Sequence, residues 1–367
     1  MDPNTAASFC CVADFKEFAL RSLPKNVVDY YCTGSGQENT IRNNRTAFDK
    51  LRIRPRILVD APGKVDISTE VLGCPLQIPF GIAPSAMQKL AHPDGEIGNA
   101  KAIGKLGGVY IHSTISTTSV EEVASAAPDT IKWFQIYFLK DRELTKRVVQ
   151  KAEKVGYRAL VFTADANVMG LRYAVMKNPT ELPPHLKLGN FDWSVPEIDT
   201  LGLDSYLNQL LDHNISWKDI KWLKEITKLP IIIKGILTAE DALLAIDHGV
   251  SAIIVSNHGG RQLDSAPASI EALREIVKVV GDKIDIFFDG GVEFGMDIFK
   301  ALALGAKMVF LGKSALWGLT CGGEKGIQKL LEILQHELVT TMGLTGCQNL
   351  KAIKKNMVVH ESYYDTL

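Results

Sequence analysis

A histidine and an arginine stand three residues apart on a glycine-bearing loop, in the stretch SNHGGRQLD at residues 256–264. The loop follows a short apolar run at 252–255, whose residue types predict a buried strand. A histidine can exchange a proton near neutral pH, and an arginine can bind a carboxylate through two parallel hydrogen bonds. His258 and Arg261 therefore indicate an acid–base step on a small substrate that carries a carboxylate. A hydrogen-bonded loop with a purely structural role is the alternative.

Polar residues and glycines also gather at the ends of other apolar runs, and they are Gln135, Tyr137, Thr163, Asp165, Lys234, Asp289, Gly290, Gly291, Gly312 and Lys313. A charged group at the end of a buried strand is costly unless it is paired or takes part in function. The structural alternatives are a helix cap for Asp165, an ion pair for Lys234 and a satisfied core hydroxyl for Tyr137. So many such residues favour one shared site. The glycine loops at 289–291 and 312–313 are suited to a phosphate, which loops after the last two strands of a barrel commonly hold through backbone N–H groups.

Eight short apolar runs alternate with helical patterns from about residue 79 onward, which predicts an α/β protein with a (β/α)8 barrel. The runs are 80–83, 109–112, 133–137, 159–163, 231–234, 252–255, 286–289 and 308–311. Two capping boxes predict helix starts at Ser119 and Thr238. Three glycines, Gly156, Gly249 and Gly305, are predicted to end helices. An open doubly wound sheet is the rival architecture, but its G-x-G-x-x-G motif after the first strand is missing.

The segments outside this alternation are predicted to serve the barrel. Residues 1–75 are expected to be part of the same domain, with two short helices over 12–32 broken at Pro24 and an irregular wrap over 41–75. Residues 76–355 would form the barrel domain and 356–367 a C-terminal tail. The insertion from Gly170 to Ser216 follows the fourth strand and is long for a loop, which favours a lid over the active site.

The composition excludes several classes of protein. The chain has 367 residues, is 46% hydrophobic and carries a formal net charge of -1. We expect no nucleic-acid partner, which would need a basic stripe, and no membrane span, because no apolar run reaches roughly 18 residues. The N-terminus lacks the basic start and apolar core of a secretory signal. The six cysteines are scattered without a C-x-x-C pair, which argues against a metal site or disulfide framework and for a reducing compartment.

Motifs along nearly the whole chain, residues 10–355, match one known family in order. They are YY at 30–31, APSAMQKLAHPDGE at 83–96, FQIY at 134–137, IIIKGILTAEDA at 231–242, SNHGGRQLD at 256–264, DGGV at 289–292 and KALALGA at 300–306. Through these motifs the chain resembles the FMN-dependent α-hydroxy-acid oxidase family, which includes glycolate oxidase and the animal 2-hydroxyacid oxidases.

The resemblance implies a catalytic role for several of the candidates. His258 would be the active-site base, and Asp165 would pair with it and stabilise its charged form. The substrate would be bound by Tyr30, Tyr137, Arg172 and Arg261. Of these, Tyr137 would bond the substrate hydroxyl and the others its carboxylate.

The resemblance also implies FMN as the cofactor. Lys234 would lie near N1 and O2 of the flavin, where its charge would stabilise the reduced anionic ring. The remaining contacts would be Pro84, Ser85 and Ala86 against the ring, Ser113, Gln135 and Thr163 along its edge, and Ser256, Asp289, Gly290, Gly291, Glu293, Gly312 and Lys313 around the rest of the site.

The implied reaction converts a 2-hydroxy acid to a 2-oxo acid, with the electrons passing through FMN to dioxygen and hydrogen peroxide as product. Hydride transfer and α-proton abstraction both stay open. One alternative is a non-oxidising family member with a weakened or lost FMN site that acts as a binding protein, and another is a dehydrogenase with a different electron acceptor. Outside the family, Lys234 could be the Schiff-base lysine of an isomerase or aldolase. A homo-oligomer, by resemblance a tetramer, is expected.

Two departures from the family pattern lie in the predicted phosphate loops. The family continues DGGV with an arginine where this chain has Glu293, and its Gly-Arg-Pro is Gly312-Lys313-Ser314 here. A carboxylate repels a phosphate dianion, and lysine keeps the charge of arginine but not its two-pronged geometry. A charge-assisted hydrogen bond contributes roughly 1.5–3 kcal/mol, so we expect weaker FMN binding than usual and partial loss on purification. The change Glu293→Arg should raise FMN occupancy, and unchanged occupancy would refute the expectation.

Three further departures concern a loop, a wall of the site and the C-terminus. Asn167 replaces a family proline, which predicts a less restrained loop and a less well placed Arg172. Ile115 stands where short-chain glycolate oxidases carry a tryptophan, which favours medium-chain, long-chain or bulky 2-hydroxy acids over glycolate. The chain ends in Asp-Thr-Leu, a poor match to the peroxisomal tripeptide Ser-Lys-Leu of animal relatives. We therefore expect an intracellular protein that is cytosolic or enters peroxisomes by another route.

Overall fold

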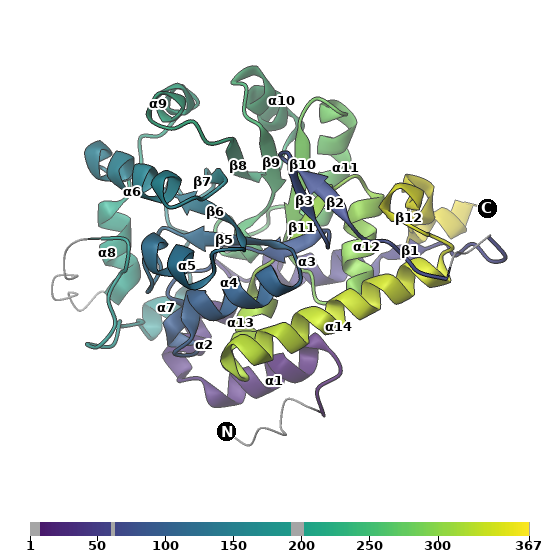
Figure 1. The fold of residues 1–367 in the computed structure, drawn as a ribbon, viewed down its shortest axis with the longest axis horizontal. Helices are drawn as coiled ribbons and strands as arrows, with labels where there is room; N and C mark the ends of the chain where they lie inside the picture. Colours follow the sequence, from purple (N-terminus) through teal and green to yellow (C-terminus); the bar gives the residue numbers. More distant parts are fainter. Residues whose placement is uncertain (1–7, 60–62, 192–201, 367) are drawn as a thin grey trace.

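The computed structural model describes residues 8–59, 63–191 and 202–366, and eight parallel strands within them close into a barrel (Figure 1). The strands are β4 (Phe80–Ile82), β5 (Val109–Ser113), β6 (Ile131–Ile136), β7 (Ala159–Thr163), β8 (Ile231–Ile236), β9 (Ala252–Val255), β10 (Asp285–Asp289) and β11 (Met308–Leu311). Each of the eight predicted runs forms one strand. The strands pair in chain order, and β11 pairs with β4 to close the ring. The predicted (β/α)8 barrel is confirmed.

Helices that follow the strands in sequence cover the outside of the barrel (Figure 1). They are α4 (Gly95–Lys105), α5 (Val120–Ala126), α6 (Arg142–Lys154), α9 (Lys218–Ile226), α10 (Ala239–Asp247), α11 (Ser269–Val280), α12 (Gly295–Ala303) and α14 (Gly323–Leu344). The predicted ends lie where expected, with a full capping box at Ser119 and only its first hydrogen bond at Thr238. Ser119 and Thr238 accept the N–H groups of Glu122 and Asp241 at the starts of α5 and α10. The three predicted terminal glycines all have positive φ.

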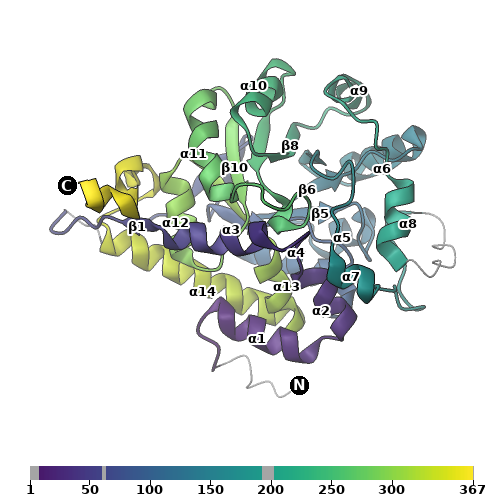
Figure 2. The same ribbon diagram turned by 180° about the vertical axis from the view of Figure 1, so that it is seen from behind.

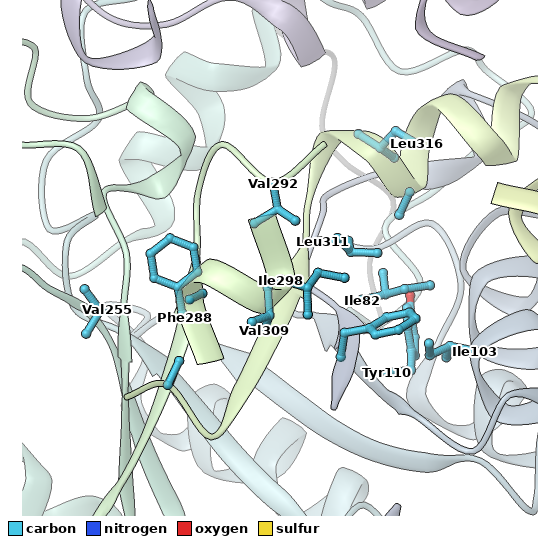
Figure 3. Close-up of a cluster of buried hydrophobic side chains, with 14 of the residues drawn as sticks. Ile82, Ile103, Tyr110, Val255, Phe288, Val292, Ile298, Val309, Leu311 and Leu316 are labelled. Atoms are coloured by element: carbon cyan, nitrogen blue, oxygen red, sulfur yellow. The ribbon is translucent and has the colours of Figure 1, made fainter. Parts of the chain in front are cut away.

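The two faces of each strand pack into two separate apolar layers. Inward side chains form one cluster inside the barrel, where the rings of Trp133, Phe287 and Phe310 lie 5.3–6.1 Å apart. Outward side chains pack under the helices, and Figure 3 shows part of this layer with Ile82, Ile103, Tyr110, Val255, Phe288, Val292, Ile298, Val309, Leu311 and Leu316 labelled. Because both faces are buried, the strands appear in the sequence as continuous apolar runs.

The N-terminal segment is more regular than predicted. The helices α1 (Val12–Ser22) and α2 (Lys25–Cys32) are broken at Pro24, as predicted. The expected irregular wrap over 41–75 is wrong, because this segment holds a regular helix, α3 (Asn39–Asp49), and three short strands that pair outside the barrel. Two of the buried positions of α3 are Thr40 and Asn44, so no apolar stripe marks the helix in the sequence.

Two antiparallel ladders lie outside the barrel. β1 (Leu51–Ile53) pairs with β12 (Val358–His360), so the predicted C-terminal tail is fastened to the N-terminal segment. β2 (Thr69–Val71) pairs with β3 (Cys74–Leu76), and the Val71 and Leu76 side chains join the cluster inside the barrel. This hairpin therefore packs against the interior at the end where the strands begin.

The insertion after β7 contains α7 (Tyr173–Lys177) and α8 (Gly202–Leu210), and residues 192–201 between them lie outside the described part. Figure 2 shows α7 beside α2, which contacts it. One more helix, α13 (Lys313–Thr320), follows β11 directly. Within the described ranges no helix is long and apolar enough to cross a bilayer, and no cluster of three or more potential metal ligands occurs.

Candidate active site

A cavity of about 520 Å³ lies where the strands end. Most of the predicted site residues line it, and they are Tyr30, Pro84, Ser85, Ala86, Ser113, Ile115, Gln135, Tyr137, Thr163, Arg172, Lys234, His258, Arg261, Asp289, Gly290, Gly291, Glu293, Gly312 and Lys313. The two others, Asp165 and Ser256, are hydrogen-bonded to residues of the lining. The structure thus brings all of the predicted residues together.

The strand period explains why these side chains meet. Successive side chains of a strand point to opposite faces, so positions two apart share a face. The last inward apolar residues of six strands are Ile111, Trp133, Val161, Ile232, Ile254 and Phe287. Two residues after each of them come Ser113, Gln135, Thr163, Lys234, Ser256 and Asp289. The barrel therefore ends in a polar layer directly above its apolar filling.

His258 and Asp165 form a hydrogen-bonded acid–base pair. Nδ1 of His258 lies 2.9 Å from Oδ1 of Asp165. The other ring nitrogen, Nε2, is therefore available to a substrate in the cavity that His258 lines. Burial lowers the pKa of His258, as do Lys234 and Arg261, while Asp165 raises it. Burial raises the pKa of Asp165, but the charges of His258 and Lys234 bring the pKa below its usual value. At neutral pH the pair is therefore a neutral imidazole held by a carboxylate, which can accept a proton and stabilise the resulting charge.

Tyr30 of α2 holds the two arginines of the site. The guanidinium groups of Arg172 and Arg261 each lie 5.0 Å from the centre of its ring. Both also donate a hydrogen bond to its main-chain oxygen. Two cations fixed at one place can bind a carboxylate in a defined orientation. Tyr137 lines the same cavity, and burial raises the pKa of its hydroxyl, so the group remains a hydrogen-bond donor.

Arg172 is well placed despite the missing proline, contrary to the prediction. The loop from Asp165 to Gly170 is restrained by Gln262, whose amide donates to the oxygens of Asp165 and Val168 and accepts the N–H of Gly170. The side chain of Arg172 is buried. Gln262 thus restrains the loop in which Asn167 stands at the family's proline position.

Two buried atoms of the polar layer have no hydrogen-bond partner among the described residues, Nε2 of Gln135 and Oγ1 of Thr163. The amide oxygen of Gln135 accepts the N–H of Thr114 and the hydroxyl of Ser113, which fixes the amide. A buried donor without a partner costs about 1–3 kcal/mol, so these atoms require a polar ligand. The carbonyl and N–H edge of a flavin ring fits them. Lys234, whose Nζ lies 2.8 Å from Ser256 Oγ and 3.5 Å from Asp289 Oδ2, adds a buried cation suited to a reduced flavin.

The other end of the cavity holds the predicted phosphate loops. Gly290 and Gly291 have φ of 111° and 79°, and Gly312 is the N-cap of α13, whose first turn carries no acidic residue. A helix N-terminus of this kind attracts anions. Lys313 donates to two main-chain oxygens, and burial together with Arg261 lowers its pKa to about 7. The residues present therefore fit FMN at both ends of the cavity.

Several lining residues had no distinct signal in the sequence. Leu207 and Leu211, from α8 and the residue after it, and Met169 stand with Ile115 on the cavity wall. Lys16 of α1 reaches the phosphate end. Apolar residues on an amphipathic helix and a surface lysine are common everywhere, so only the tertiary structure reveals these contacts.

Comparisons with known proteins agree with this geometry. Residues 19–360 match the FMN-dependent dehydrogenase family. The chain is 45% identical over 355 residues to 2-hydroxyacid oxidase 1 of Homo sapiens, covering 95% of this chain and 96% of that protein. It is 45% identical over 351 residues to glycolate oxidase of Spinacia oleracea, covering 95% of each. Mandelate oxidase with benzoyl-formic acid has a TM-score of 0.87 at 36% identity, over 95% of this chain and 98% of that one. The flavin-binding domain of baker's yeast flavocytochrome b2 has a TM-score of 0.87 at 36% identity, and the match covers 96% of this chain and 87% of that one.

Proposed function

The chain belongs to the FMN-dependent dehydrogenase family as a 2-hydroxy-acid oxidase that uses FMN, and from this premise we propose its substrate and its catalytic residues. It oxidises 2-hydroxy acids with a medium-length, long or bulky apolar side chain to 2-oxo acids, and dioxygen is reduced to hydrogen peroxide. The observation that carries the proposal is the cavity itself. It sets the His258–Asp165 pair beside two arginines fixed on Tyr30.

The chain's own groups bind the substrate and move its proton. Arg172 and Arg261 hold the carboxylate, and the hydroxyl of Tyr137 bonds the substrate oxygen. His258 accepts a proton from the substrate through Nε2, and Asp165 stabilises the imidazolium that forms. When bound, FMN supplies the acceptor for two electrons.

The apolar part of the cavity supports the larger substrates. Ile115, Met169, Leu207 and Leu211 line it, and none of them carries a group that would bond a second polar end of the substrate. Among the relatives of known structure, mandelate oxidase is named for an aromatic 2-hydroxy acid. An apolar wall of this kind binds an alkyl or aromatic side chain through burial, at about 25 cal/mol per Å².

The proposal is tested by steady-state oxidation of glycolate, 2-hydroxybutanoate, 2-hydroxyoctanoate and mandelate, with oxygen uptake and peroxide measured together. We expect kcat/KM to rise from glycolate to the larger acids, with one peroxide per oxygen consumed. Oxidation that reduces an artificial dye but yields no peroxide would instead identify a dehydrogenase with another acceptor.

Assembly and location belong to the same proposal. A homo-tetramer is implied by the resemblance, and sedimentation equilibrium of the holoenzyme measures it. The resemblance to the family also supports a cytosolic or peroxisomal location.

A further inference from the structure

The phosphate end of the cavity contains more positive charge than its two loops supply. Glu293 replaces the family arginine there, but Lys16 of α1 lines the same region with its Nζ 3.5 Å from Oε1 of Glu293. Lys313, at the start of α13, lines the same cavity. Lys16, Lys313 and Glu293 therefore face this end, beside Arg45, which also lines the cavity and donates to the main-chain oxygen of Gly291 while it pairs with Asp297. A phosphate dianion bound here favours the charged form of both lysines.

The backbone that carries Lys16 is firmly placed. Its neighbour Phe15 is fully buried, and the main-chain oxygen of Phe15 accepts the thiol of Cys321. α1 packs along α13, the helix whose N-cap lies on the cavity. In Figure 2 the two helices are neighbours on one side of the molecule. The backbone of Lys16 is thus fixed by packing, while its side chain is 45% exposed.

The partners of Lys313 give its ammonium form no countercharge. Its Nζ donates to the main-chain oxygens of Cys32 at 3.1 Å and Gly259 at 3.4 Å, and it has no carboxylate partner in the part of the chain that the structure describes. The carboxylate that pairs with Lys16 is also in contact with solvent, because the Glu293 side chain is one-third exposed. A phosphate dianion entering between them can bond both ammonium groups.

We propose that Lys16 binds the FMN phosphate together with Lys313, so that α1 supplies the cation that the loop after β10 lacks. Glu293 then orients Lys16 through their ion pair. This inference rests on the proposed FMN site and adds to it a residue from the N-terminal helix. It makes FMN retention depend on how α1 packs.

The experiment compares FMN with riboflavin, which has the same ring and no phosphate. Each flavin is titrated into the apoprotein, and the dissociation constant is measured from quenching of flavin fluorescence. We expect Lys16→Met to weaken FMN roughly tenfold and to leave riboflavin within twofold. Arg21→Met is the matched control, because Arg21 lies on the same helix, pairs with Glu17 and is outside the cavity. It should change neither constant.

A second pair of variants separates binding of the phosphate from mere neutralisation of Glu293. In a Glu293→Gln background, adding Lys16→Met should again weaken FMN severalfold. If the double variant instead binds FMN as tightly as Glu293→Gln alone, Lys16 only compensates the carboxylate and the proposal is overturned. Equal weakening of FMN and riboflavin by Lys16→Met would also overturn it. Failure of the wild-type protein to bind either flavin would refute the FMN site, a separate outcome.

Discussion

Replacing Asp165 by asparagine tests the proposed base most sharply, because asparagine keeps the shape and one acceptor oxygen and removes the charge. It also puts an NH2 group in place of Oδ2, a buried atom without a partner among the described residues. The Nδ1–Oδ1 distance to His258 is 2.9 Å, and the side chains are 22% and 14% exposed, so water screens the pair weakly. A hydrogen bond to a charged group contributes about 1.5–3 kcal/mol, and 1.36 kcal/mol is tenfold in rate. The rate constant for anaerobic flavin reduction should therefore fall roughly ten- to a hundredfold.

The pH profile of the same variant gives a second readout. Asp165 raises the pKa of His258 against burial and the charges of Lys234 and Arg261. Without the carboxylate that pKa falls further. The base acts in its neutral form, which predominates above its pKa, so the acid limb of the rate should move to lower pH. Stopped-flow reduction between pH 4 and 9 measures both effects. An unchanged rate, or a limb displaced to higher pH, would refute the reasoning.

A control variant separates this effect from general damage. Asp141 caps α6 by accepting the N–H of Leu144, outside the cavity. Asparagine caps helices as well as aspartate does. Asp141→Asn should therefore leave both the reduction rate and its pH profile unchanged.

Three other changes have defined outcomes. Arg261→Lys loses the planar fork that stacks on Tyr30, so KM for the acid should rise at least about tenfold, and an unchanged KM contradicts its role. Ile115→Trp narrows the apolar wall and should shift the kcat/KM ratio towards glycolate over 2-hydroxyoctanoate; no shift counts against the substrate proposal. Gly81→Ala places a Cβ 2.4 Å from the oxygen of Val109 inside the barrel and should lower the free energy of unfolding by about 1–3 kcal/mol in urea titrations. A loss below about 0.5 kcal/mol would show that the barrel adjusts.

The barrel and its polar layer were predictable because the signals are local. A parallel strand buried on both faces appears as a continuous apolar run. The residue at which that run turns polar marks the end of the strand. Lys234 and Asp289 follow this rule, and their neighbours around the ring do so as well. The chain order of the strands then places these ends on one rim.

The parts that sequence reasoning missed depend on tertiary contacts. The helix α3 buries Thr40 and Asn44, which are polar, so its period is invisible. Lys16 meets Glu293 across 277 positions of the chain. Gln262 stiffens a loop some ninety residues earlier, which sequence spacing does not indicate. In each case a polar side chain has a structural role that its neighbours in sequence do not reveal.

The most direct test of the central claim is the visible spectrum of the purified protein with added FMN, before and after anaerobic 2-hydroxyoctanoate. The account predicts bound-flavin bands that bleach within the mixing time of a manual assay in the wild type. In His258→Asn the same bands should be present and bleach far more slowly. Bands that persist in the wild type with every 2-hydroxy acid would contradict the proposed reaction. Equal bleaching in the two proteins would contradict His258 as the base.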